Sequence, residues 1–211
     1  MRLRFWWQEA AVNLAFSLGA SVLYGILMAL QMNSAFTGLV SMLPFYMLMF
    51  GIFVNLGMCL TVYRTAVPLS LSFGSTRRET IVGLQVYHLL PAVGLSALAG
   101  LICALPGSDV FLTAGEMMAL GVGLFLLLTA VGILLGGLHI RFGVAASVVT
   151  GVALVIIAVG GGIVGILVVS DQLKQLLFGC AQWIVLTVGA VAYGLAFLLE
   201  KRIVRRYAVK L

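Results

Sequence analysis

Charged side chains are scarce in this chain. Only 9% of its 211 residues are Asp, Glu, Lys or Arg, and 63% are hydrophobic, whereas soluble domains carry about 25% charged residues. Too few polar side chains remain to cover the surface of a water-soluble domain. The composition therefore excludes a soluble protein and indicates an integral membrane protein.

Sequence motifs that carry catalytic chemistry are also missing. The chain has no G-x-S-x-G, no H-E-x-x-H, no phosphate-binding-loop lysine and no aspartate pair inside an apolar run. Cys59, Cys103 and Cys180 stand singly and are interpreted as small packing residues. His88 and His139 lack an acid or cysteine at ligand spacing. We therefore predict no catalytic residue, metal or cofactor on this chain.

Six apolar runs are long enough to cross a membrane as helices, which takes roughly 20 mostly apolar residues. Little sequence is left between them, and neither an internal repeat nor a low-complexity linker divides the chain. We predict an all-α integral membrane protein with a single transmembrane domain over residues 1–211. The predicted spans are residues 12–31, 39–62, 80–105, 117–138, 144–169 and 176–198.

The segment before the first span is basic and aromatic. Arg2 and Arg4 stand beside Phe5, Trp6 and Trp7, and amphipathic rings of this kind prefer the headgroup layer. We predict an N-terminal interfacial segment here, with a plain aromatic anchor as the alternative. The apolar run that follows exceeds the core of a cleaved signal, which is about 7–15 residues long, so we expect it to remain as a span.

Basic residues are distributed unevenly between the two ends of the predicted spans. With the N-terminus in the cytoplasm, all of them except Lys174 fall on the cytoplasmic side, as the positive-inside rule requires. We therefore predict a multi-pass protein of the cell membrane with both termini in the cytoplasm. This topology, and no nucleic-acid partner, accounts for the net charge of +6. The cytoplasmic basic residues are Arg2, Arg4, Arg64, Arg77, Arg78, Arg141, Lys201, Arg202, Arg205, Arg206 and Lys210.

A polar corner between the second and third spans is the most informative local pattern. Gly74 is the residue type that ends a helix in the left-handed conformation. Thr76-x-x-Glu79 is a capping box that opens the next helix. A second capping box, Thr113-x-x-Glu116, opens the fourth span. Each box predicts the residue at which a helix begins.

The residues before Gly74 predict a short helix with two apolar faces. Helical spacing places Leu69 and Phe73 on one side. Val67 and Leu71 fall on another side. One face can rest on the membrane bundle while the other meets a partner protein. The alternative is an ordinary capped turn with a basic edge.

Residues 69–83 resemble the first cytoplasmic loop of permease subunits in the ABC type-2 transporter family. In that family a short coupling helix precedes a Gly-x-Thr-Arg-Arg/Lys stretch, which here reads Gly74-Ser75-Thr76-Arg77-Arg78. The resemblance implies an elbow helix at the N-terminus and a coupling helix between spans 2 and 3, on which a separate ATPase subunit docks. The implied docking residues are Val67, Pro68, Leu69, Leu71, Phe73, Gly74, Thr76, Arg77, Arg78 and Glu79.

The same resemblance implies the function of a permease subunit of an ATP-binding-cassette exporter. ATP and Mg would be bound by the partner ATPase, and the chain would pair with a second copy or a paralogue to form the pathway. The alternatives are a six-span substrate-binding subunit of an energy-coupling-factor vitamin importer, an intramembrane enzyme, or a non-transport membrane protein. Peptides, lipids and hydrophobic drugs all remain open as substrates, because pathway walls and lipid-facing walls look alike in one sequence.

His88 is an ionisable residue deep inside the third span. It lies about 16 Å from the start of the span near Arg77, at 1.5 Å per residue, and Gln85 precedes it by one turn. Intramembrane ionisable residues are candidates for function. The alternative is an interhelical hydrogen bond to Asn55 or Gln182. We take Asn55, Gln85, His88 and Gln182 as candidate pathway-lining residues.

Three consecutive glycines, residues 160–162, lie inside the fifth predicted span. The span, residues 144–169, is longer than the hydrocarbon thickness of about 30 Å requires. Glycine is the residue most able to leave helical geometry. We therefore predict a break at these glycines, followed by a short segment at the outer membrane surface.

Overall fold

The computed structural model describes residues 2–31, 36–105, 112–143, 148–151 and 171–206, and these are almost entirely helical. Five helical stretches of the described residues are long and apolar enough to cross a membrane. The prediction of a helical, multi-pass membrane protein is confirmed at this level. The helices are α1 (Arg2–Gln31), α2 (Phe36–Arg64), α3 (Ala66–Ser72), α4 (Arg77–Cys103), α5 (Ala114–Phe142) and α7 (Asp171–Arg206).

The helices extend beyond the predicted spans. Helix α1 begins at Arg2, ten residues before the predicted start at residue 12, and α7 continues to Arg206, past the predicted end at residue 198. The apolar runs mark only the part that fits the hydrocarbon core, while a helix can continue into the headgroup layer, where charged side chains are solvated. Apart from residues 148–151, which are helical, the fifth predicted span and its glycine break lie outside the described residues.

The N-terminal segment that the sequence predicts at the membrane interface is part of α1 and not a separate element. Helix α1 runs without interruption from its second residue. Trp6 is only 1% exposed, and its ring stands edge-on to Tyr87 of α4, with the centroids 6.4 Å apart. A side chain at Gly83 of α4 would collide with the Trp6 indole. Because α4 makes room for this tryptophan, the first turns of α1 belong to the bundle.

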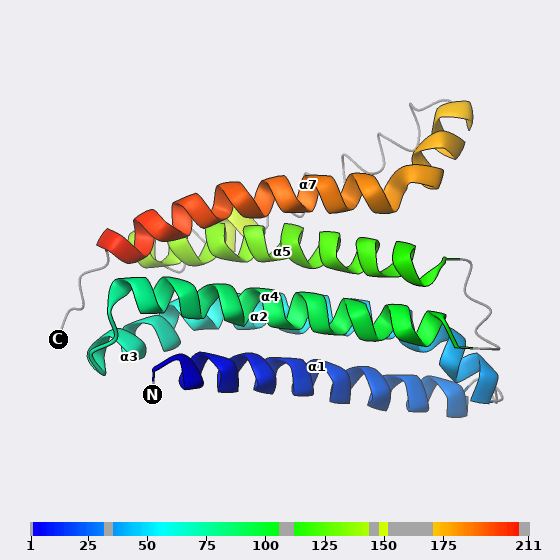
Figure 1. The fold of residues 1–211 in the computed structure, drawn as a ribbon, viewed down its shortest axis with the longest axis horizontal. Coiled ribbons are helices and arrows are strands. Elements are labelled where there is room, and N and C mark those ends of the chain that lie inside the picture. Colours follow the sequence, from blue (N-terminus) through cyan, green and yellow to red (C-terminus); the bar gives the residue numbers. More distant parts are fainter. Residues whose placement is uncertain (1, 32–35, 106–111, 144–147, 152–170, 207–211) are drawn as a thin grey trace.

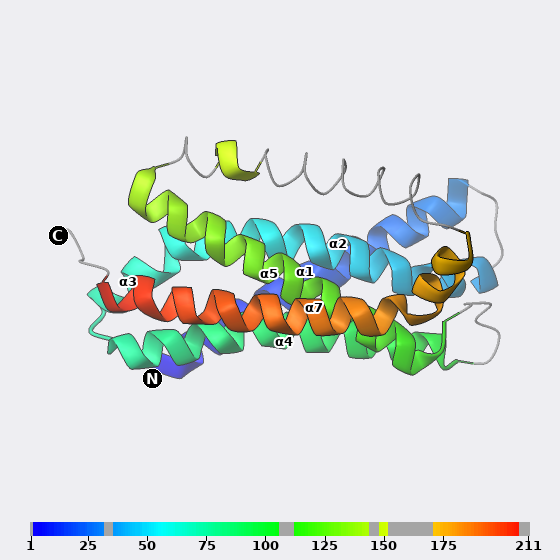
Figure 2. The same cartoon turned by 90° about the horizontal axis from the view of Figure 1, so that it is seen from above.

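The helices stack in successive layers (Figure 1). Helix α1 packs against α2 and α4, these two pack on α5, and α7 packs mainly on α5. Figure 2 shows α7, coloured orange to red, crossing over α5 in the view from above. The outer surfaces of α1 and α7 expose many large apolar side chains, as expected where a bundle faces lipid.

Glycines bring α5 and α7 into backbone contact where they cross. A Cβ atom built on Gly123 of α5 would lie 2.6 Å from the backbone nitrogen of Leu186, and one on Gly189 of α7 would meet the carbonyl oxygen of Gly123. No side chain can be accommodated at either position without moving a helix. Small residues at such crossings let membrane helices pack closely.

Among the residues that the structure describes, the buried side chains form two core clusters, one in each half of the bundle. The half that contains α3 has an aromatic core around Trp6, Tyr63 and Tyr87. The opposite half has a core of aliphatic, methionine and phenylalanine side chains. We call them the α3-side core (Trp6, Ala10, Val62, Tyr63, Ala66, Val67, Leu84, Tyr87, Ala130, Ile133, Ala196 and Val204) and the far-side core (Met47, Leu48, Ala92, Leu95, Ala99, Met117 and Phe125).

Candidate functional site

The short helix α3 has two different faces, as the sequence predicts. Val67 is 1% exposed, and Leu71 packs against the same α3-side core. Leu69 is 44% exposed and Phe73, directly after the helix, is 75% exposed. Val67 and Leu71 therefore hold the helix on the bundle, and of the predicted docking residues these two pack against the core. Those at the surface are Leu69, Phe73, Gly74, Thr76, Arg77 and Arg78, with Pro68 and Glu79 partly covered.

The turn after α3 also has the predicted geometry. Gly74 adopts a φ of 77°, in the left-handed region that glycine enters without strain. The Thr76 amide donates to Glu79 Oε2 at 2.8 Å, and the Glu79 amide donates back to Thr76 Oγ1 at 3.2 Å. Ser70 Oγ lies 3.4 Å from Thr80 Oγ1, which links α3 to α4. The corner is therefore a defined structure, fixed at both of its ends.

Basic side chains surround this end of the bundle. The N-terminus, α3 and the C-terminal end of α7 lie together (Figure 1). Arg77 donates a hydrogen bond to the backbone carbonyl of Arg205, which joins the start of α4 to the last turn of α7. Arg4, Arg64 and Arg78 are exposed. Exposed apolar side chains on α3 thus stand at a positively charged end of the molecule.

A cluster of polar side chains lies buried behind α3. His88 and Glu200 are both 0% exposed, and the His88 Nε2 to Glu200 Oε1 distance is 3.3 Å. Tyr63 donates a hydrogen bond to Glu200, and its hydroxyl lies 3.4 Å from His88 Nε2. Cys59 Sγ lies 3.4 Å from the other ring nitrogen, His88 Nδ1. Helices α2, α4 and α7 all contribute to this site.

Gln85 completes the cluster on its outer side. Its Nε2 donates to Glu200 Oε2 at 2.6 Å, and its Oε1 accepts a hydrogen bond from Tyr193. Both oxygens of the Glu200 carboxylate therefore have partners, which a buried carboxylate needs to offset the loss of hydration. We call Cys59, Tyr63, Gln85, His88, Tyr193 and Glu200 the buried polar cluster.

The order of groups across His88 is thiol, imidazole, carboxylate. In enzymes this order can activate a cysteine nucleophile, with the imidazole as base and the carboxylate as its orienting group. Here Cys59, His88 and Glu200 are all fully buried, so no substrate reaches the sulfur in this conformation. Among the described residues no group of three or more His, Cys, Asp or Glu side chains is arranged to hold a metal ion. The geometry is that of a polar link between helices.

The structure brings three of the four predicted pathway residues together. Gln85 and His88 both contact Glu200. Asn55 lies one helical turn before Cys59, which contacts His88. Asn55 Nδ2 donates to Thr129 Oγ1 of α5 at 2.9 Å. His88 does make interhelical contacts, although its partners are not the predicted Asn55 and Gln182.

Gln182 belongs to a different part of the molecule. Its Nε2 donates to Glu116 Oε1 at 3.1 Å, at the start of α5. Glu116 also accepts from the amide of Thr113 at 2.9 Å, so the second predicted capping box is confirmed. This contact lies at the end of the bundle opposite to α3.

Sequence reasoning missed Glu200, the acid at the centre of the cluster. The residue stands just before Lys201 at the end of the last apolar run, where an acid is easily taken for a surface residue. A weak signal was present, since Tyr193 and Glu200 are seven residues apart and share one helix face.

Comparison with known proteins identifies no relative. No protein-family model matches the chain, and neither a curated protein nor a solved structure is significantly similar to it.

Proposed function

We propose that this chain is the membrane-spanning permease subunit of an ATP-binding-cassette exporter, driven by a separate ATPase subunit that docks on α3. The observation that carries the proposal is the two-faced character of this corner. Val67 is buried in the α3-side core, while Phe73 and Leu69 are exposed beside it. An apolar surface of this kind at the charged end of a bundle is typical of a protein contact.

The absence of a phosphate-binding loop from the sequence supports a separate ATPase. If transport by this chain is driven by ATP, the energy of hydrolysis reaches it through a contact with another subunit. The α3 corner is suited to transmit it, because its inner face is bonded to α4 through Ser70 and Thr80. The transport pathway would form between two copies, or between this chain and a paralogue.

The proposed orientation places α3 and both termini in the cytoplasm. Arg4, Arg64, Arg78 and the Arg77–Arg205 contact all lie at the α3 end, and basic residues are retained on the cytoplasmic side of membrane proteins. A cytoplasmic α3 is also required for contact with a soluble ATPase.

Photo-crosslinking from position 73 tests the docking proposal. A photoreactive amino acid in place of Phe73 should crosslink, in native membranes, to a protein that carries a phosphate-binding loop. Phe73→Asp should reduce the ATP hydrolysis that co-purifies with the tagged chain at least tenfold, because a charge would be buried at the contact.

Phe142 provides the matched control. It is 60% exposed at the end of α5, on the same side of the bundle but outside α3. Phe142→Asp should leave the co-purifying hydrolysis unchanged. Undiminished hydrolysis with Phe73→Asp, or a crosslinked partner without a phosphate-binding loop, would refute docking on α3.

A further inference from the structure

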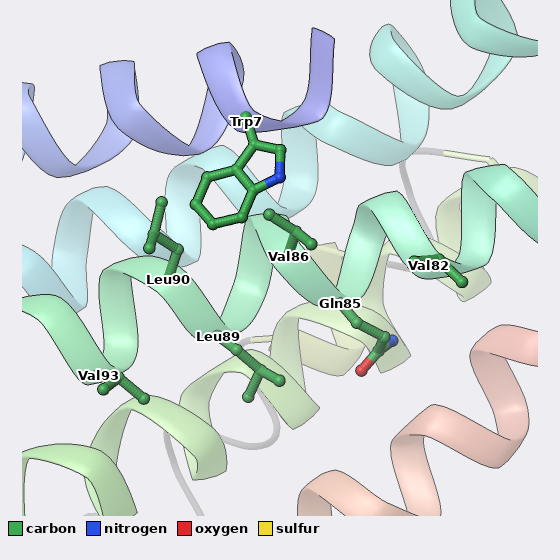
Figure 3. A pocket seen from close by; sticks show the side chains of 7 residues that line it. All are labelled: Trp7, Val82, Gln85, Val86, Leu89, Leu90 and Val93. Atoms are coloured by element: carbon green, nitrogen blue, oxygen red, sulfur yellow. The ribbon is translucent and has the colours of Figure 1, made fainter. Parts of the chain in front are cut away.

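An apolar groove runs along the outer side of α4 next to α1 (Figure 3). It has a volume of about 370 Å³. Trp7 of α1 reaches across to α4 and forms one wall, and Gln85 stands at the side that faces α7. Both ends of the Gln85 amide are already bonded to α7, so the groove offers a ligand apolar contacts. The lining residues are Trp7, Val82, Gln85, Val86, Leu89, Leu90 and Val93.

The length of the groove fits one leaflet of a bilayer. From Val82 to Val93 helix α4 rises about 16 Å, at 1.5 Å per residue. The hydrocarbon core is about 30 Å thick, so the groove covers about half of it. A transmembrane helix of a partner protein would need a surface along the whole thickness. An acyl chain of a single lipid needs only this half.

Two exposed arginines flank the end of the groove nearest α3. Arg4 lies three residues before Trp7 on α1, and Arg78 lies four residues before Val82 on α4. These spacings place each arginine on the same helix face as the groove residue that follows it. From these helix faces the two guanidinium groups can reach the headgroup of a lipid whose chain fills the groove. Basic residues at such positions bind anionic headgroups.

We propose that this groove is a binding site for one anionic phospholipid of the leaflet on the α3 side. An acyl chain lies against Trp7 and Val86, and the phosphate is held by Arg4 and Arg78. The inference does not depend on the proposed ATPase partner, because it uses the α1–α4 surface and not α3.

Quenching of Trp7 fluorescence by brominated lipid tests the site. Trp183, exposed on α7, is first replaced by Phe. The signal of the buried Trp6 is obtained from the Trp7→Phe/Trp183→Phe protein and subtracted. The protein is reconstituted in phosphatidylcholine vesicles that contain a minor fraction of phosphatidylglycerol, and bromine is placed on the chains of one lipid or of the other.

Brominated phosphatidylglycerol should quench Trp7 saturably, with one lipid per chain. The preference over phosphatidylcholine should be about 25-fold at low ionic strength, from two arginines that each contribute about fivefold. Arg4→Gln/Arg78→Gln should remove the preference. Arg64→Gln/Arg202→Gln, which removes two exposed arginines from the ends of α2 and α7 at the same end of the bundle, should keep it.

Two results would overturn the proposal. Equal quenching by both brominated lipids would mean that Trp7 meets only the bulk lipid around the protein. Absence of quenching by either lipid would mean that another part of the protein, or a second copy of the chain, occupies the groove.

Discussion

The cores of the two halves of the bundle are held together by different forces. In the half that contains α3, aromatic side chains enclose the His88–Glu200 pair and its hydrogen-bond partners. In the opposite half the core consists of side chains such as Leu95, Met117 and Phe125. Lipid tails are as apolar as these side chains, so the transfer of apolar side chains from lipid to a helix contact gains little free energy. Hydrogen bonds between buried polar side chains do favour the association of helices.

Helix α7 shows this difference along its own length. It packs on α5 through the backbone contact of Gly189 with Gly123, and it reaches α4 mainly through the bonds of Glu200 and Tyr193 to His88 and Gln85. The first contact depends on shape and the second on charge and hydrogen bonding. They should therefore respond differently to substitution.

Removal of Glu200 is expected to have the largest effect. Glu200→Ala should lower the free energy of unfolding by about 3–5 kcal/mol, because it breaks the buried His88–Glu200 pair and leaves Tyr63 and Gln85 without their acceptor. Glu200→Gln should cost less, since an amide can still accept the hydrogen bond of Tyr63. Equilibrium unfolding in mixed detergent micelles measures both.

A variant in the apolar core of the other half provides the reference for the effect of Glu200→Ala. Leu95 is fully buried in the far-side core, and Leu95→Ala should cost about 2–5 kcal/mol through the cavity it leaves. If Glu200→Ala costs less than about 1 kcal/mol while Leu95→Ala costs its expected amount, the buried polar cluster is not what stabilises the half with α3.

Closing the glycine contact is expected to have an intermediate effect. Gly123→Ala places a methyl group against the backbone of α7 at Leu186, and overpacking of this kind costs about 1–3 kcal/mol. Gly194→Ala is the control on α7, because a Cβ at Gly194 meets nothing within 4 Å. It should be neutral or slightly stabilising, as alanine is the better helix former. Equal effects in the same unfolding assay would argue against a close α5–α7 crossing.

The two capping boxes should give the smallest and most similar effects. Thr76→Ala at the start of α4 and Thr113→Ala at the start of α5 each remove a side-chain acceptor from a helix N-terminus. Each should cost about 1 kcal/mol. Because the boxes lie at opposite ends of the bundle, similar losses would show that the two halves differ in their cores and not in their helix ends. Clearly different losses for Thr76→Ala and Thr113→Ala would show that the helix ends of the two halves differ as well.

Local features of the structure could be predicted from the sequence. The capping boxes, the positive φ of Gly74 and the opposite faces of Val67 and Phe73 all depend on residues within one or two helical turns of each other. The approximate positions of the spans follow from apolar runs, which report directly on the hydrocarbon core.

Contacts between distant parts of the chain could not be predicted in the same way. Gln85 and Glu200 are 115 residues apart, and nothing in either segment indicates that α4 and α7 meet at this depth. The burial of Trp6 could not be predicted for a related reason. Tryptophan is a residue type that is common at the membrane surface, but the space beside Gly83 on another helix makes Trp6 a core residue.

The junction between α2 and α3 fixes the direction of Phe73. Only Thr65 separates the two helices, and backbone bonds continue across it, from the Thr65 amide to Thr61 and from the Leu69 amide to Thr65. The helical hydrogen bonds thus hold α3 in a fixed orientation relative to α2. Each residue in a helix corresponds to a rotation of about 100°. One inserted residue would turn α3 by about a quarter of a revolution, which would draw Val67 out of the core and point Phe73 elsewhere. The surface offered by α3 is set by the length of α2 as much as by its own side chains.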